Sequence, residues 1–298
     1  IVEAAVQATL GLAYYHLGMH DAARVHMERS LALSKEHLGP AHRDIAVDLN
    51  NLAMLTRAEG SLDDAERLYR ESLAMFEAIG ATQSRDYGDA LSGLGLLLAD
   101  KGKYDEAAKH FEESIEIERA QPDLKRTSLA AALNNYALLR RDRGEFDQAE
   151  SLFNEVVELL VTHFGDEHMR VADARENLAS VWVIRGKLDA ALPLYEAGLR
   201  TRRKLLGEDH PDVATSLNNI GYINFQMGRY EQAEAYYTES LALRRLYPEK
   251  PIKAYLYLLE ENRPVEAETG SGADRSVGLA LDCFRRAGET GDYPARPG

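Results

Sequence analysis

The stretch NNIGYINFQMGRYEQAEAYY, residues 218–237, decides how this chain folds. Both of its flanks repeat apolar side chains at helical spacing, yet Gly228 stands between them. Glycine costs about 0.5–1 kcal/mol inside a helix, but it readily takes the positive φ that a tight turn requires. Five more glycines precede Gly228 at a constant spacing of 42 residues, at Gly18, Gly60, Gly102, Gly144 and Gly186. A chain that turns at one fixed period predicts an internal repeat.

The six repeats, aligned on these glycines, share residue types at fixed distances. Alanine lies five positions after each glycine, and large apolar residues lie nine and thirteen positions after it. These three positions share one helix face, because residues four apart lie one above the other. A large residue eight positions before the glycine is followed by glycine or alanine seven before it. An acidic residue three positions after the glycine suits a helix start, where it can cap free N–H groups and complement the helix dipole. Each repeat therefore predicts a helix, a tight turn and a second helix.

Composition restricts the classes of partner. The 298 residues carry a net charge of −14 and a sequence pI near 5.2. Such a surface repels the phosphates of nucleic acids and anionic lipids, so we expect no nucleic-acid partner. No run of 18 apolar residues occurs in the sequence, and we expect no membrane insertion. The single cysteine, Cys283, and the lack of a visible signal peptide favour a reducing, cytoplasmic location. The chain begins with Ile1 rather than methionine, which suggests a piece of a longer protein.

The repeat columns resemble the tetratricopeptide repeat (TPR) over about residues 4–247. The usual unit has about 34 residues, whereas this one has 42, and the extra length lies between units. The linker LGEDHPDVATSLNN, residues 206–219, is similar to the long-linker repeats of kinesin light chains and of related bacterial proteins. Two linkers match it in part, at residues 38–51 and 164–177, and the other two depart from it. The resemblance implies an all-α, right-handed superhelical solenoid.

The end of the array departs from the pattern. Gly270 falls on the period, but Arg275 and Asn262 stand where alanine and a large residue are expected. A terminal repeat must present a polar outer face, so a degenerate unit suits this place. We expect six TPR units over residues 1–248, a degenerate seventh repeat or helical cap over 249–288, and a disordered tail over 289–298.

Catalytic patterns are missing from the sequence, including the nucleophile elbow, the phosphate loop and the paired-histidine zinc motif. We therefore expect no enzyme, no catalytic residue and no cofactor. His42, His168 and His210 share one column, 18 positions before their glycines. Metal ligands must lie within about 2.0–2.3 Å of one ion, whereas neighbouring helices are about 8–10 Å apart. We expect these histidines to hold the linkers rather than a metal.

The first helix of each pair lines the concave wall of TPR arrays. The resemblance therefore points to the positions 13, 9, 6 and 2 before each glycine. Nine positions before it, four of the six repeats have asparagine, which is a poor helix former: Asn51, Asn135, Asn177 and Asn219. Its amide both donates and accepts hydrogen bonds, and in related repeats it holds the main chain of a peptide. An apolar stripe runs beside this row, six positions before the glycines, at Met54, Leu96, Leu138 and Tyr222.

Charged residues near these columns suit both acidic and basic partners. Arg57 and Arg141, three positions before their glycines, suit acidic side chains of a bound peptide. Four acidic residues of the first helices favour basic ones, namely Asp89, Asp100, Asp142 and Asp173. In the alternative interpretation, the asparagines serve neighbouring backbone or loop groups and the apolar stripe packs between repeats.

Two functions follow from the sequence. The first is a non-catalytic scaffold that binds a peptide or partner segment in the concave groove. The second is a regulatory or sensor TPR domain of a larger signalling protein, such as a bacterial Ser/Thr kinase or an NTPase. An enzyme is the least favoured, because no set of titratable groups converges in the sequence pattern.

Overall fold

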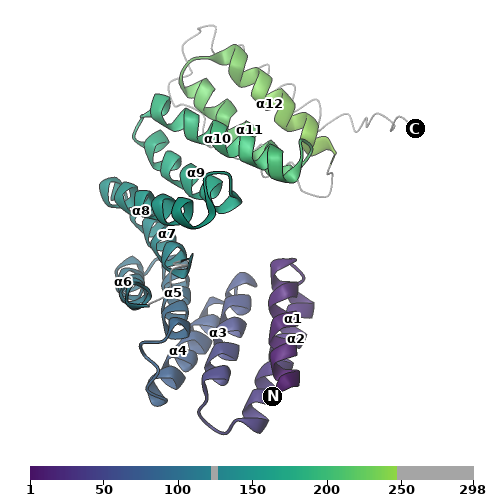
Figure 1. Ribbon diagram of the computed structural model, residues 1–298, viewed down its shortest axis with the longest axis vertical. Helices are drawn as coiled ribbons and strands as arrows, with labels where there is room; N and C mark the ends of the chain where they lie inside the picture. The colour runs from purple at the N-terminus through teal and green to yellow at the C-terminus, as the bar shows by residue number, and fades with distance from the viewer. Residues whose placement is uncertain (122–126, 247–298) are drawn as a thin grey trace, which may run out of the picture. The chain divides into compact units, whose positions relative to one another are not determined.

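The computed structural model (Figure 1) describes residues 1–121 and 127–246 of the chain. Over these residues it contains twelve α-helices and no strand, which confirms the predicted all-α repeat fold. The helices are α1 (Val2–His16), α2 (His20–His37), α3 (Arg43–Ala58), α4 (Leu62–Ala78), α5 (Arg85–Asp100), α6 (Tyr104–Ala120), α7 (Thr127–Asp142), α8 (Phe146–Phe164), α9 (Met169–Ile184), α10 (Leu188–Leu206), α11 (Pro211–Gln226) and α12 (Tyr230–Arg245). The expected cap at 249–288 and tail at 289–298 lie outside the described residues.

Consecutive helices pair into six hairpins, and a glycine of the 42-residue period turns the chain in each. The φ angles of these glycines lie between 72° and 85°, in the left-handed region. At Gly228 the backbone N–H bonds to the carbonyl of Phe225 at 3.0 Å, and the N–H of Arg229 bonds to the carbonyl of Asn224 at 2.8 Å. This pair of bonds is the Schellman motif, which satisfies the last carbonyls of a helix and requires positive φ between them.

The helices form two compact units, which meet in sequence between Gly165 and Asp166. The N-terminal unit contains the four hairpins α1–α8, and the C-terminal unit contains the two hairpins α9–α12. Within the units, the second helix of a hairpin packs on the first helix of the next, as α2 does on α3 and α10 on α11. In the N-terminal unit the first helices also contact one another in the order α1, α3, α5, α7. The first helices there form one layer, which the second helices cover on one side.

Small residues let the two helices of a hairpin approach closely. A Cβ atom added to Gly95 would lie 2.9 Å from the ring of Phe111, and one added to Gly221 would lie 2.9 Å from the ring of Tyr237. The alanine five positions after each turn glycine is between 0 and 2% exposed. The predicted pairing of small and large columns is thus what fills the core.

A serine column that the sequence argument missed also joins the helices of a hairpin. It lies twelve positions after the turn glycine in four hairpins, at Ser30, Ser72, Ser114 and Ser240. Each hydroxyl is buried and donates to a backbone carbonyl of the first helix 26 residues earlier, at 2.6–2.9 Å. The recurrence of serine at one column was the available signal.

The acidic residues three positions after the turn glycines mark helix starts, as predicted, but they are not the N-cap residues. Asp63 and Asp105, for example, lie in the first turn, and the N-cap residues before them make no side-chain cap bond. A negative charge at this end of a helix still complements the dipole.

Candidate functional site

The first helices present one side that remains open to solvent. We define the first-helix face as the positions 13, 9, 6 and 2 before each turn glycine. Most of these residues are half-buried or exposed. By contrast, the positions seven and eight before the glycine are buried in hairpins two to six, where they contact the second helices. The columns chosen from the sequence are therefore the accessible ones.

The asparagines nine positions before the turn glycines are buried to different extents. Asn135, Asn177 and Asn219 are half-buried, whereas Asn51 is only 8% exposed. The amide of Asn135 donates one hydrogen bond to the hydroxyl of Ser92, at 3.4 Å, and so links α7 to α5. One of its donors thus serves the scaffold, in agreement with the alternative interpretation of the row.

The row is interrupted in the third hairpin, where Gly93 replaces asparagine. A Cβ atom at Gly93 would lie 2.5 Å from the ring of Tyr69, which projects from α4. The tyrosine ring therefore takes the space of the missing side chain, and its burial raises the pKa of the hydroxyl. The apolar stripe continues past this point, since Met54, Leu96 and Leu138 are all half-buried; in the C-terminal unit, Tyr222 is half-buried as well.

Both arginines beside the face already have acidic partners. The Nε atom of Arg57 on α3 lies 2.6 Å from a carboxylate oxygen of Asp100 on α5. Arg141 lies 2.8 Å from the carboxylate of its neighbour Asp142. Two of the four acids named from the sequence are therefore neutralised by the two arginines.

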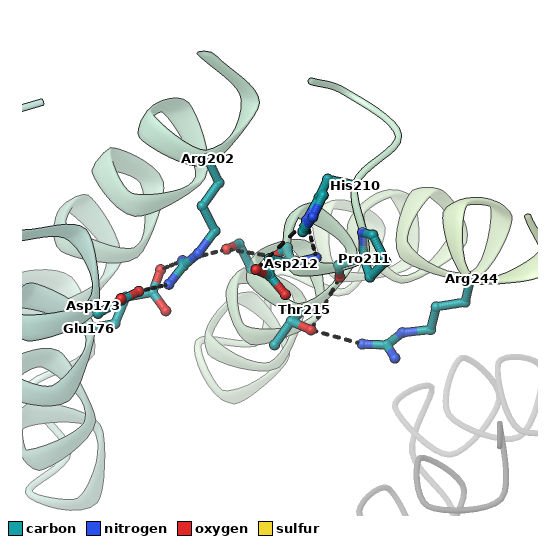
Figure 2. Close-up of polar contacts among 9 residues, drawn as sticks. Asp173, Glu176, Arg202, His210, Pro211, Asp212, Thr215 and Arg244 are labelled. Carbon is teal, nitrogen blue, oxygen red and sulfur yellow. Dashed lines mark hydrogen bonds and ion pairs between the residues drawn. The ribbon is translucent and has the colours of Figure 1, made fainter. Parts of the chain in front are cut away.

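Asp173 is neutralised by a network in the C-terminal unit (Figure 2). Arg202 of α10 donates to Asp173 at 2.6 Å and to the hydroxyl of Ser216 at 2.7 Å, and it also pairs with Glu176. A Cβ atom at Gly198 would collide with Glu176, so glycine makes room for this pair. The next hairpin repeats the arrangement, because Arg244 donates to Thr215 at 3.3 Å. Sequence reasoning missed both arginines, although they share the position 16 residues after the turn glycine.

Asp89 on α5 differs from the other three acids. Its side chain is exposed, and it makes no ion pair or hydrogen bond with any residue that the structure describes. The surrounding protein nevertheless removes part of its hydration, which raises the pKa of the carboxyl to about 6. Asp86 raises this pKa further, and Arg85 opposes the shift.

The three linker histidines each cap the helix that follows. The Nδ1 atoms of His42, His168 and His210 accept the backbone N–H two residues later, at 3.1, 3.2 and 3.2 Å. His210 and its bond to Asp212 appear in Figure 2. The expectation that they hold the linkers is confirmed. Over residues 1–121 and 127–246, no three His, Cys, Asp or Glu side chains gather closely enough to hold a metal ion.

Comparison with protein families agrees with this geometry. The model for a MalT-like TPR region matches residues 1–197, more than half of the chain, and a tetratricopeptide repeat model matches residues 170–245. The chain is a TPR protein of the MalT-like family. Among the described helices, none is long and apolar enough to cross a membrane.

Solved structures show the same TPR fold at low sequence identity. BtubC (BKLC) from P. vanneervenii is 22% identical, with a TM-score of 0.61, over 90% of this chain and 95% of that one. A putative kinesin light chain of Podosopora anserina with nearly identical TPR-like repeats is 18% identical, with a TM-score of 0.61, over 70% and 98%. A Rap protein complexed with competence and sporulation factor is 15% identical, with a TM-score of 0.59, over 84% and 77%. A search of the curated proteins found no match. A putative kinesin light chain is thus among the solved structures that share this fold, in line with the resemblance of the linkers.

Proposed function

We propose that this TPR protein is a non-catalytic scaffold that binds an extended segment of a partner protein along its first-helix face. TPR folds typically serve as protein-interaction scaffolds. The observation that carries the proposal is that, within each unit, half-buried amides share the face of the first helices with half-buried apolar side chains. These are Asn135 and Leu138 in the N-terminal unit, and Asn177, Asn219 and Tyr222 in the C-terminal unit. Both kinds of side chain lie on the side of the first helices that the second helices leave accessible.

The chemistry of the face suits a peptide main chain. An extended segment presents N–H and C=O groups at regular intervals, and an asparagine amide pairs with either kind. Each such bond contributes only about 0.5–1.5 kcal/mol net, so affinity requires several bonds together with apolar anchors. Leu96 and Leu138 on neighbouring first helices offer a partly exposed apolar surface for these anchors. The amides would hold any sequence, and the stripe would select apolar side chains.

The test removes two amides and measures peptide affinity. Peptides are first selected on the wild-type chain from a random library displayed on phage, and their affinities are measured by calorimetry. We expect Asn177→Ala combined with Asn219→Ala, both in the C-terminal unit, to weaken binding there by about tenfold or more, because each lost bond costs about 1 kcal/mol. The melting temperature of the variant is measured alongside, and cooperative melting shows that a loss of affinity does not come from unfolding.

The matched control is Asn154→Ala on the second helix α8. Asn154 is exposed and bonds only within its own helix, to the carbonyl of Glu150 at 2.9 Å. This variant should bind selected peptides as the wild type does. Equal affinity in the double variant and the wild type would contradict the assignment of the face.

A further inference from the structure

Asp89 is equivalent in the repeat to Asp173, which pairs with a cation of the protein itself, Arg202. It lies thirteen residues before its turn glycine, as Asp173 does in the fifth hairpin. The equivalent residues on the neighbouring first helices are Val47 and Ala131, which carry no charge. Asp89 is therefore a single carboxyl between apolar positions on the first-helix face of the N-terminal unit.

The repeats themselves show what is missing at Asp89. In the fifth hairpin, Arg202 reaches the carboxylate of Asp173 from the position 16 residues after the turn glycine. In the third hairpin that position is Glu118, whose side chain is 2% exposed. An acid thus stands where an arginine would neutralise Asp89.

The arginines near Asp89 are engaged with other acids. Arg85, one turn earlier on α5, lies 3.4 Å from Glu118. Arg43 on α3 lies 2.6 Å from Asp86. Among the described residues, Asp86 and Arg85 are the charged groups that act on the pKa of Asp89, and neither forms an ion pair with it. Partial desolvation, together with Asp86, raises the pKa of Asp89 to about 6, and no residue that the structure describes forms an ion pair with its charged form.

We propose that the first-helix face of the N-terminal unit selects a partner segment carrying a lysine or arginine, whose cation pairs with the carboxylate of Asp89. This inference rests on the proposed function, since it names the chemistry of the bound segment. Charge complementarity at such a site fixes the register of the segment as well as its affinity.

The geometry also sets the place of the cation in the segment. Asp89 and Leu96 are seven residues apart on α5, which is about 10 Å at 1.5 Å per residue. An extended segment advances about 3.3 Å per residue. The basic residue should therefore lie about three residues from the apolar anchor that contacts Leu96.

The experiment uses the same displayed library on three chains: wild type, Asp89→Asn, and Asp64→Asn as a control. The carboxylate of Asp64 lies on the second helix α4, outside the first-helix face, and already pairs with Arg67 at 3.2 Å. Peptides selected on the wild type should be enriched in lysine or arginine about three residues from an apolar residue. Asp89→Asn should weaken their binding about tenfold, and Asp64→Asn should not change the preference for a base. An Asp89→Lys chain should recover affinity for the same peptide with glutamate in place of its base.

A pH titration supplies a second readout. Peptide affinity for the wild type should fall as the pH drops through about 6, because protonation removes the charge of Asp89. Asp89→Asn should lack this dependence. A carboxyl pKa at or below the ordinary value in the unbound chain, measured by NMR, would show that the protein supplies its own cation and would overturn the inference.

The outcomes separate this inference from the proposed function. One outcome would overturn the inference alone. In it, the selected peptides show no preference for a base, bind wild type and Asp89→Asn equally, and bind weakly to Asn135→Ala, which removes an amide of the same unit. A library that yields no binder above the background of an unrelated protein would overturn both.

Discussion

His210 shows how one side chain secures the long linker between hairpins. Its ring nitrogen accepts the N–H of Asp212 and thereby satisfies one of the free donors at the start of α11. Pro211 takes the first helical position, where no N–H is needed. The sequence HPD is thus a helix start built from three different residue types.

We predict that His210→Ala lowers the free energy of unfolding by about 0.5–2 kcal/mol, the usual cost of losing an N-cap side chain. His210→Asn is the matched control, because asparagine caps well and should restore most of the stability. Urea denaturation followed by circular dichroism measures both. Equal stability of the alanine and asparagine variants would show that the hydrogen bond contributes nothing.

Asp89 and Asp173 show that equivalent residues of a repeat need not be equivalent in charge. Both lie on the same column, yet Asp173 has Arg202 beside it, whereas the corresponding residue near Asp89 is Glu118. Considered alone, α5 and α9 each present only an exposed aspartate at this position. The difference arises from the second helix, 29 residues further along the chain.

At the scale of the element, each hairpin is held by a turn, a close contact and a buried hydroxyl. Gly95 admits the ring of Phe111, and Ser114 donates to the carbonyl of Gly88 at 2.7 Å. In the fourth and fifth hairpins the serine is replaced by Val156 and Gly198. Apolar packing or a separate ion-pair network takes over there, so the hydroxyl is one of several ways to join two helices.

We predict that Ser72→Ala lowers the free energy of unfolding by about 0.5–1.5 kcal/mol, since a buried hydrogen bond to the carbonyl of Ala46 is lost. Ser151→Ala, at an exposed position of α8, is the control and should be neutral. Chemical denaturation of both variants measures the difference. A neutral Ser72→Ala would mean that the carbonyl is satisfied by its own helix alone.

At the scale of the whole molecule, stability should be a sum over hairpins and their interfaces. Removing residues 61–102 takes out one period, α4 and α5, and keeps every column in register. In the shortened chain Ser114 would stand opposite Ala46, which normally accepts from Ser72. After the deletion, α3 and α6 can therefore still form the serine hydrogen bond that joins the two helices of a hairpin.

We predict that this deletion leaves a cooperatively unfolding helical protein whose urea m-value is lower by about one sixth, because 42 of the 246 residues through the last described helix are removed. The control deletion, residues 61–98, breaks the period and should abolish cooperative unfolding. Circular dichroism during urea titration distinguishes them. Similar behaviour of the two deletions would contradict a modular array.

The sequence alone determined the all-α repeat fold, the six turns, the pairing of small and large columns and the linker role of the histidines. These features recur with the 42-residue period and depend on neighbours within a hairpin, so a periodic pattern is enough to reveal them. Only the tertiary structure decided that Arg57 and Arg141 have acidic partners, that Asn51 is buried, and that Asp89 has no cation beside it among the described residues. These properties depend on which side chains from separate helices meet, and two helices with the same columns can carry different charges at the point of contact.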